Sequence, residues 1–311
     1  MTHDCSCETH DHDGPLAELV TLRDWLRYAV SRFNQADLFY GHGCLNAYDE
    51  AAWLLLSTLS LPRDRLEPFL DACILSEERE KLLEAIRLRT EERIPTAYLC
   101  REAWLGDFRF HVDERVIIPR SFFGELLEEG FAPWIDSPES IRTALDLCTG
   151  SGCLAVLMAY AFPFAEIVAA DISADALRVA DKNVKAYQLE SRIELVQSDV
   201  FNALEERTFD FILCNPPYVT AESVAALPPE YLHEPDMALG AGEDGLDVIR
   251  RLIAEAERHL NPGGWLAVEV GHNQSIVEAA FPDLPFTWLS TGEAQNVVFL
   301  LNKKELPGQS N

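Results

Sequence analysis

Apolar residues near the start of the chain recur at the spacing of α-helices. Spacings of three and four, which place residues along one face of a helix, separate Leu19, Leu22, Leu26, Ala29 and Phe33. The sequence "GHGCLN" breaks this pattern, and Asn46 is placed to cap a second helix that carries "AAWLLLSTL". Beyond Pro62, "SEEREKLLEAIRLRT" predicts another helix behind Ser76, with acidic residues in its first turn. Residues 15–93 are therefore predicted to form a small helical-bundle domain.

The hydrophobic period changes at residues 94–120. Here "AWLGDFRFHVDERVIIPR" alternates apolar and polar residues around Gly106-Asp107, which is typical of short β-strands. We expect a β-hairpin that links two domains.

From residue 121 to 303, predicted strands alternate with predicted helices. The strands are "TALDL", "EIVAAD", "RIELVQSD", "TFDFILC" and "GGWLAVEV", and the helices are "CLAVLMAYAF", "SADALRVADKNVKAYQL" and "GLDVIRRLIAEAERHL". A helix near 273–281 and the strands "FTWLS" and "NVVFLL" follow, before a C-terminal tail at 304–311. This alternation predicts an α/β domain with a mostly parallel, doubly wound sheet.

The charge balance narrows the possible partners. With 25 Lys and Arg against 52 Asp and Glu, the formal net charge is −27. Such a chain repels nucleic-acid phosphates, whose binding depends on cationic side chains. The charge favours a basic partner, or serves only to keep the protein in solution.

The first residues form an acidic tail, predicted to be disordered over residues 1–14. It contains His3, Cys5, Cys7, His10 and His12. These side chains are an alternative transition-metal site, although their spacing matches no standard zinc module. The tail has no apolar stretch of a secretory signal, and no uncharged run is long enough to span a bilayer. We expect a cytoplasmic protein with reduced cysteines.

The turn after the first predicted strand of the α/β domain, "LDLCTGSGCLAV", is a candidate cofactor loop. Gly150 and Gly152 allow close backbone approach, but the loop is neither the dinucleotide motif nor a P-loop. Asp171 ends the next strand and is placed to bind ribose hydroxyls; Asp199 ends the third and is placed to accept from an exocyclic amine. These features predict an adenosine ligand without phosphate, such as S-adenosyl-L-methionine. Alternatively, each acid caps the following helix.

The fourth strand ends in "NPPY", residues 215–218. Because proline has no N–H, Pro216 and Pro217 leave carbonyl groups to accept hydrogen bonds. With the side-chain oxygen of Asn215, they present two acceptors to the hydrogens of a planar amino group, and Tyr218 can pack beside it. An ordinary turn is the alternative. The motif predicts methyl transfer to nitrogen without a metal ion.

Together, "CTGSG", Asp171 and "NPPY" resemble the class I S-adenosylmethionine-dependent methyltransferases that modify planar amino groups. The resemblance implies a Rossmann-like, seven-stranded sheet with an antiparallel final strand, which "NVVFLL" can supply. The helical domain, "IPTAYL" and "VIIPRS" resemble the glutamine methyltransferases of translation proteins. "IPRSFFGE", "LCTGSGC" and "YLHEPDMALGAGEDGLDVIRRL" are similar to the branch acting on ribosomal large-subunit protein three. Departures are Phe122, where that branch commonly has proline, and "TGEAQNVVFLL", where it has a Gly-Gly-Asp-Gly run.

The resemblance implies the roles of particular residues. The glutamine amide site is Asn215, Pro216, Pro217 and Tyr218. Cofactor contacts are expected from Asp146, Cys148, Thr149, Gly150, Ser151, Gly152, Asp171, Asp199, Val200 and Asn215. Arg120 and Glu125 are candidates for closing over the methionine end. The helical domain is expected to recognise a basic ribosomal protein, and the enzyme to be a monomer.

Three other functions stay open at this point. The same chemistry on peptide chain release factors is one, although their methyltransferases usually read "IPRPDTE" and "LGTGTG". Methylation of adenine in nucleic acid is a second, against which the acidic charge counts. A non-catalytic binding module is the third.

Overall fold

The computed structural model describes residues 13–240, 242–292 and 294–308, which form two compact units. The first unit ends at Cys100 and the second begins at Arg101. The tail predicted over residues 1–14, with its histidines and cysteines, lies outside the described residues except for its last two.

The first unit is helical. Its α-helices are α1 (Asp13–Glu18), α2 (Leu22–Gln35), α3 (Ala47–Thr58), α4 (Ser76–Thr90) and α5 (Thr96–Cys100), with a 3-10 turn η1 (Glu67–Phe69) before α4. The apolar stripe predicted from Leu19 to Phe33 is buried, as expected. Asn46 caps α3, since its Oδ1 accepts the N–H of Asp49 at 3.0 Å. The helix predicted behind Ser76 is α4, which starts at this residue with acidic residues in its first turn, and the Glu78 carboxylate accepts the N–H of Leu75 at 2.9 Å.

A buried ion pair lies in the core of this helical unit. Arg89 of α4 donates to the carboxylate of Glu50 in α3, and both side chains are almost fully buried. The hydroxyl of Thr96 donates to the same carboxylate at 2.8 Å, and Arg89 also donates to the carbonyl of Phe39 at 3.1 Å. These contacts join α3, α4 and α5.

The second unit opens with the predicted hairpin. Strands β1 (Ala103–Leu105) and β2 (Phe108–Phe110) pair antiparallel. An extended segment then leads to helix α6 (Phe123–Glu128) and the 3-10 turn η2 (Pro138–Ser140).

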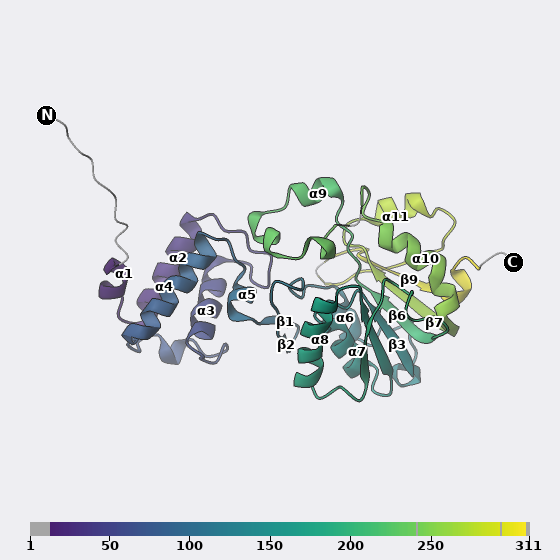
Figure 1. Ribbon diagram of the computed structural model, residues 1–311, viewed down its shortest axis with the longest axis horizontal. Helices are drawn as coiled ribbons and strands as arrows, with labels where there is room; N and C mark the ends of the chain where they lie inside the picture. Colours follow the sequence, from purple (N-terminus) through teal and green to yellow (C-terminus); the bar gives the residue numbers. More distant parts are fainter. Residues whose placement is uncertain (1–12, 241, 293, 309–311) are drawn as a thin grey trace. The chain divides into compact units, whose positions relative to one another are not determined.

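A seven-stranded sheet forms the centre of the second unit (Figure 1). Its strands are β3 (Thr143–Leu147), β4 (Glu166–Asp171), β5 (Ile193–Gln197), β6 (Phe209–Cys214), β7 (Leu260–Glu269), β8 (Thr287–Leu289) and β9 (Val298–Asn302). The spatial order is β5-β4-β3-β6-β7-β9-β8, and β9 runs antiparallel to both of its neighbours. The predicted α/β class and the antiparallel final strand are therefore confirmed.

Helices cover both faces of this sheet (Figure 1). On one face lie α6, α7 (Cys153–Ala161) and α8 (Ala174–Ala186); on the other lie α10 (Asp247–His259) and α11 (Gln274–Ala280). Successive residues of a strand point to opposite faces, so Ala144 packs in one apolar core and Leu145 in the other. Between β6 and α10 the chain forms α9 (Ala221–Ala225) and the 3-10 turns η3 (Pro229–His233) and η4 (Asp236–Ala238); η5 (Lys303–Glu305) follows β9.

Candidate active site

The carboxyl end of β3 continues into α7 through the loop Cys148–Gly152. Cys148, Gly150 and Gly152 have φ angles of +59°, +53° and +77°. A Cβ on Gly152 would lie 3.0 Å from the Cβ of Ala180 in α8, so this position needs glycine to pack against that helix. A Cβ on Gly150 would meet nothing within 4 Å. The loop therefore exposes its backbone at Gly150 while Gly152 fixes its position.

Asp171, at the end of β4, is bonded to this loop. Its Oδ2 accepts the N–H of Gly150 at 2.8 Å, and its Oδ1 accepts the N–H of Ser173 at 2.8 Å. Burial raises the pKa of this carboxyl, and the two N–H donors oppose that effect. A carboxylate accepts about four hydrogen bonds, so the hydroxyls of a ribose can still bind. The next residue, Ile172, is 52% exposed and places apolar surface beside the acid.

Asp146 in β3 is a fully buried acid beneath the same loop. Its Oδ2 accepts the hydroxyl of Thr149 at 2.5 Å, while none of the described residues donates to Oδ1. Burial raises its pKa to about 7. A buried acceptor without a donor is uncommon in folded proteins and calls for a partner such as a ligand or water.

Asp199 lies in a different environment from the other two acids. Arg251 of α10 donates to its Oδ1 at 2.6 Å and to its backbone carbonyl at 3.3 Å. The following residue, Val200, is buried with a φ of +53°. The Asp199 carboxylate, which the sequence predicts to accept from an exocyclic amine, therefore also accepts a hydrogen bond from Arg251.

The residues Asn215–Tyr218 leave the sheet next to the glycine loop. β3 and β6 are neighbours, and Leu147 lies opposite Cys214, so both loops begin at the same point of the carboxyl edge. Pro216 is buried, and Asn215 and Tyr218 are half-buried. The structure thus brings together the two motifs that the sequence singled out.

Three residues distant in sequence enclose Tyr218. The side chain of Asn273 donates to the tyrosine carbonyl at 2.7 Å. A Cβ on Gly245 would lie 2.4 Å from that carbonyl oxygen, and one on Gly271 would lie 2.8 Å from the phenol ring. Both glycines have positive φ angles, of +77° and +55°. No other residue type fits at these two positions without displacing the tyrosine.

Glu269, the last residue of β7, contacts the hydroxyl end of the same tyrosine. Its Oε1 accepts from the Tyr218 hydroxyl at 3.3 Å. Its Oε2 accepts from the Ser121 hydroxyl at 2.5 Å and from the N–H of Phe122 at 3.1 Å. The side chain is fully buried, and burial raises its pKa to about 7. Burial also raises the pKa of Tyr218, so the phenol keeps its proton and donates.

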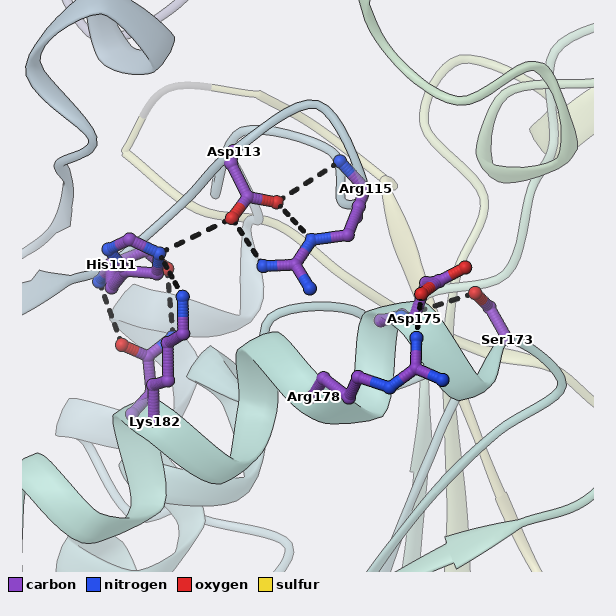
Figure 2. Close-up of polar contacts among 9 residues, drawn as sticks. His111, Asp113, Arg115, Ser173, Asp175, Arg178 and Lys182 are labelled. Atoms are coloured by element: carbon purple, nitrogen blue, oxygen red, sulfur yellow. Dashed lines mark hydrogen bonds and ion pairs between the residues drawn. The ribbon is translucent and has the colours of Figure 1, made fainter.

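A polar cluster holds the segment after the hairpin against α8 (Figure 2). Asn183 accepts the N–H of His111 at 2.7 Å and donates to the carbonyls of His111 and Ser151 at 3.0 and 2.8 Å. Beside it, Lys182 lies 3.0 Å from the His111 ring, and Arg115 donates twice to Asp113. Through Ser151, Asn183 therefore joins this segment to the glycine loop.

Arg120 and Glu125, the candidates for the methionine end, each form hydrogen bonds with another loop of the second unit. Arg120 donates to both carboxylate oxygens of Glu234, with its second nitrogen at 2.6 Å. The Glu125 carboxylate accepts the N–H of Gly292 at 2.8 Å. Both side chains fix loops of the second unit in this structure.

Within the described residues, no group of three or more His, Cys, Asp or Glu side chains is arranged to hold a metal ion. The metal site considered for the tail lies outside those residues. The helices of the described chain are each too short or too polar to cross a membrane.

Comparisons with known proteins connect this site to a family. Residues 131–230 match the family model of the methyltransferase small domain. The chain is 57% identical over 292 residues to the ribosomal protein uL3 glutamine methyltransferase of Neisseria meningitidis, covering 94% of this chain and 96% of that protein. The identically named protein of Neisseria gonorrhoeae is 56% identical, with 94% and 97% covered. That of Bordetella pertussis is 53% identical, with 93% and 97% covered.

Proposed function

The chain belongs to the family of ribosomal protein uL3 glutamine methyltransferases, and we propose that it methylates the side-chain amide nitrogen of a glutamine in uL3. It is an S-adenosylmethionine-dependent protein glutamine methyltransferase. The observation that carries the assignment of its site is the register of β3 and β6, which starts the glycine loop and Asn215–Tyr218 side by side.

The residues at the carboxyl edge fit S-adenosylmethionine. The open space beside Gly150 admits a ligand close to the backbone, and Asp171 retains acceptor sites for ribose hydroxyls. The buried Oδ1 of Asp146 adds an acceptor that has no donor among the described residues. The cofactor, when bound, supplies an electrophilic methyl group on a sulfonium centre. We assign its binding to Asp146, Cys148–Gly152, Asp171 and Asp199-Val200.

Asn215 and Pro216 bind the glutamine side chain in this proposal. The Asn215 side-chain oxygen and the Pro216 carbonyl each accept one hydrogen of the target –NH2, because neither of the prolines has an N–H that would compete. Both acceptors stabilise the positive charge that develops on the nitrogen during transfer. The ring of Tyr218, held by Gly245 and Gly271, packs against the bound group.

Hydrogen bonds alone do not activate the amide. Loss of amide resonance costs about 18–20 kcal/mol, whereas two charge-assisted hydrogen bonds supply roughly 1.5–3 kcal/mol each. Fixed orientation of the reacting groups contributes up to about 7–11 kcal/mol. The rigid frame around Tyr218 is therefore as important as the acceptors, since it prevents the amide from turning away.

The charge of the chain agrees with a ribosomal protein as substrate. A net charge of −27 attracts a basic protein and repels nucleic acid. We propose that the helical unit takes part in substrate recognition, and that the enzyme works in the cytoplasm, where ribosomal proteins are made.

The test is methyl transfer from labelled S-adenosylmethionine to purified uL3, with release factors and RNA offered separately. We expect label on one glutamine of uL3 and none after Asn215→Ala. Label on release factors or RNA, with uL3 unmodified, would refute the proposal. Mass spectrometry of ribosomes from a strain lacking this chain provides the second check, because the methyl group on uL3 should be missing there.

A further inference from the structure

The segment that follows Tyr218 forms a closed loop over residues 219–240. Its ends meet in a bridge between Val219 and Gly240, and the N–H of Val219 donates to the carbonyl of Leu239 at 3.0 Å. Figure 1 shows this segment, around α9, projecting from the carboxyl edge of the sheet. The loop begins directly after Tyr218 and closes at Gly240, so both of its ends lie next to Tyr218.

Buried contacts hold this loop in place. The fully buried carboxylate of Glu234 accepts the N–H of Ile118 at 2.9 Å and two hydrogen bonds from Arg120. The same guanidinium lies over the ring of Tyr231, 5.1 Å from its centroid. These contacts fix the loop to the rest of the second unit. Binding residues are often found on loops that a rigid scaffold holds in position.

Two large apolar side chains point outward from this supported loop. Leu232 in η3 is 71% exposed, and Met237 in η4 is 54% exposed. They lie on two successive 3-10 turns, on either side of the anchored Glu234. Apolar side chains gathered on an exposed loop are typical of interaction sites, and methionine adapts well to the shape of a partner.

The negative charge of the loop favours a basic partner. Residues 219–245 contain six Asp and Glu residues and no Lys or Arg. Glu230 and Glu234 are buried, whereas Glu222, Asp236 and Glu243 are exposed. The loop that bears the exposed apolar pair thus presents exposed carboxylates and has no Lys or Arg of its own, which suits a segment with an apolar side chain next to Lys or Arg.

We propose that Leu232 and Met237, with the exposed acids Glu222 and Asp236 of the same loop, form a docking surface for the basic segment that carries the target glutamine of the substrate protein. This inference rests on the proposed function. An apolar side chain of the substrate packs on Leu232 and Met237, and neighbouring Lys or Arg side chains pair with the acids. Docking here holds the glutamine beside Tyr218 and selects one glutamine among many.

The experiment compares Leu232→Ser/Met237→Ser with Phe164→Ser, a control just before the amino end of β4, away from the carboxyl edge, whose phenylalanine is 55% exposed. Initial rates are measured with purified uL3 and S-adenosylmethionine, each varied at saturation of the other. The double variant should raise the KM for uL3 about 10-fold or more, since two buried apolar contacts are lost. The KM for S-adenosylmethionine and kcat should change less than about twofold, because the contacts are uniform binding interactions. The control should match the wild type.

Asp236→Lys tests the charge independently. It should raise the KM for uL3 and reduce its dependence on salt, because an attractive contact becomes repulsive. An active wild type with an unchanged KM for uL3 in both variants would refute the docking surface alone. A wild type that does not methylate uL3 would refute the proposed function.

Discussion

Replacing Glu269 by glutamine should make the enzyme more stable at alkaline pH and less active. The carboxyl is fully buried at the end of β7, with Ser121, Phe122 and Tyr218 as its donors. Burial raises its pKa from an ordinary 4.5 to about 7. As the pH rises through neutrality, the Glu269 carboxyl therefore loses its proton, and the buried negative charge that results costs free energy.

The size of the effect follows from the two pKa values. A carboxyl whose pKa is higher in the folded state stabilises the fold below the unfolded value of 4.5, and that contribution is lost as pH rises to about 7. The loss amounts to about 3 kcal/mol, of which roughly 2–3 kcal/mol falls between pH 5 and pH 8. Glutamine does not ionise, so the Glu269→Gln protein lacks this loss.

The assay is the free energy of unfolding of the full chain, from urea titrations at several values between pH 5 and pH 8. Relative to wild type, the Glu269→Gln protein should gain about 2–3 kcal/mol across this range. The pH dependence that Asp146 contributes is common to both proteins and cancels. Glu84→Gln is the matched control, because hydrogen bonding to Arg87 lowers the pKa of that exposed carboxyl. Parallel curves for the wild type and the Glu269→Gln protein would refute the reasoning.

Activity should move in the opposite direction. A glutamine keeps a single acceptor oxygen, and its NH2 group cannot accept a hydrogen bond as the second carboxylate oxygen does. The hydrogen bonds that join Ser121, Phe122 and Tyr218 through this side chain are therefore weakened, and the phenol ring is held less firmly. We expect kcat at pH 8 to fall about 10-fold, and the acidic decline of wild-type kcat near pH 7 to disappear. An unchanged pH–rate profile in the Glu269→Gln protein would contradict a role for this carboxyl in positioning Tyr218.

Three further changes test the fold and the site. Asn215→Ala should lower kcat about 100-fold or more in the labelled methyl-transfer assay, because an acceptor for developing charge is lost. Gly152→Ala should destabilise the chain by about 1–3 kcal/mol in thermal unfolding, since φ is +77° and the new methyl group would lie 3.0 Å from Ala180. Arg89→Leu should cost about 3–5 kcal/mol in urea unfolding by leaving the buried carboxylate of Glu50 unpaired; adding Glu50→Gln should restore part of the loss.

The sheet was predictable because its strands are buried on both faces. "TALDL" and "EIVAAD" coincide with β3 and β4, since a continuous apolar run bounded by polar residues has few other structures available. The common position of the glycine loop and Asn215–Tyr218 also followed from the pattern, because parallel strands deliver their carboxyl ends to one edge. Short elements such as α6 and α9 were missed, because one or two turns show no helical period.

The surroundings of Tyr218 could not be predicted from the motif. Gly245, Gly271 and Asn273 lie far along the chain, and in the sequence they look like ordinary turn residues. Only the folded structure shows that two glycines leave the space that the tyrosine fills. The contact between Glu269 and Tyr218 could not be predicted either, because an acid at the end of a strand is usually exposed to solvent.

Three buried acids near the carboxyl edge of the sheet lower the stability of the fold but position the loops of the site. Asp146, Glu234 and Glu269 are almost fully buried, and each accepts hydrogen bonds from a different loop around the site. Apolar side chains of similar size would stabilise such positions as well or better, since buried charge is costly. Apolar side chains would not, however, orient the Thr149 loop, the Arg120 segment or the Tyr218 hydroxyl. Three costly carboxylates at one edge therefore indicate that this enzyme gives up stability to hold its loops in a single arrangement.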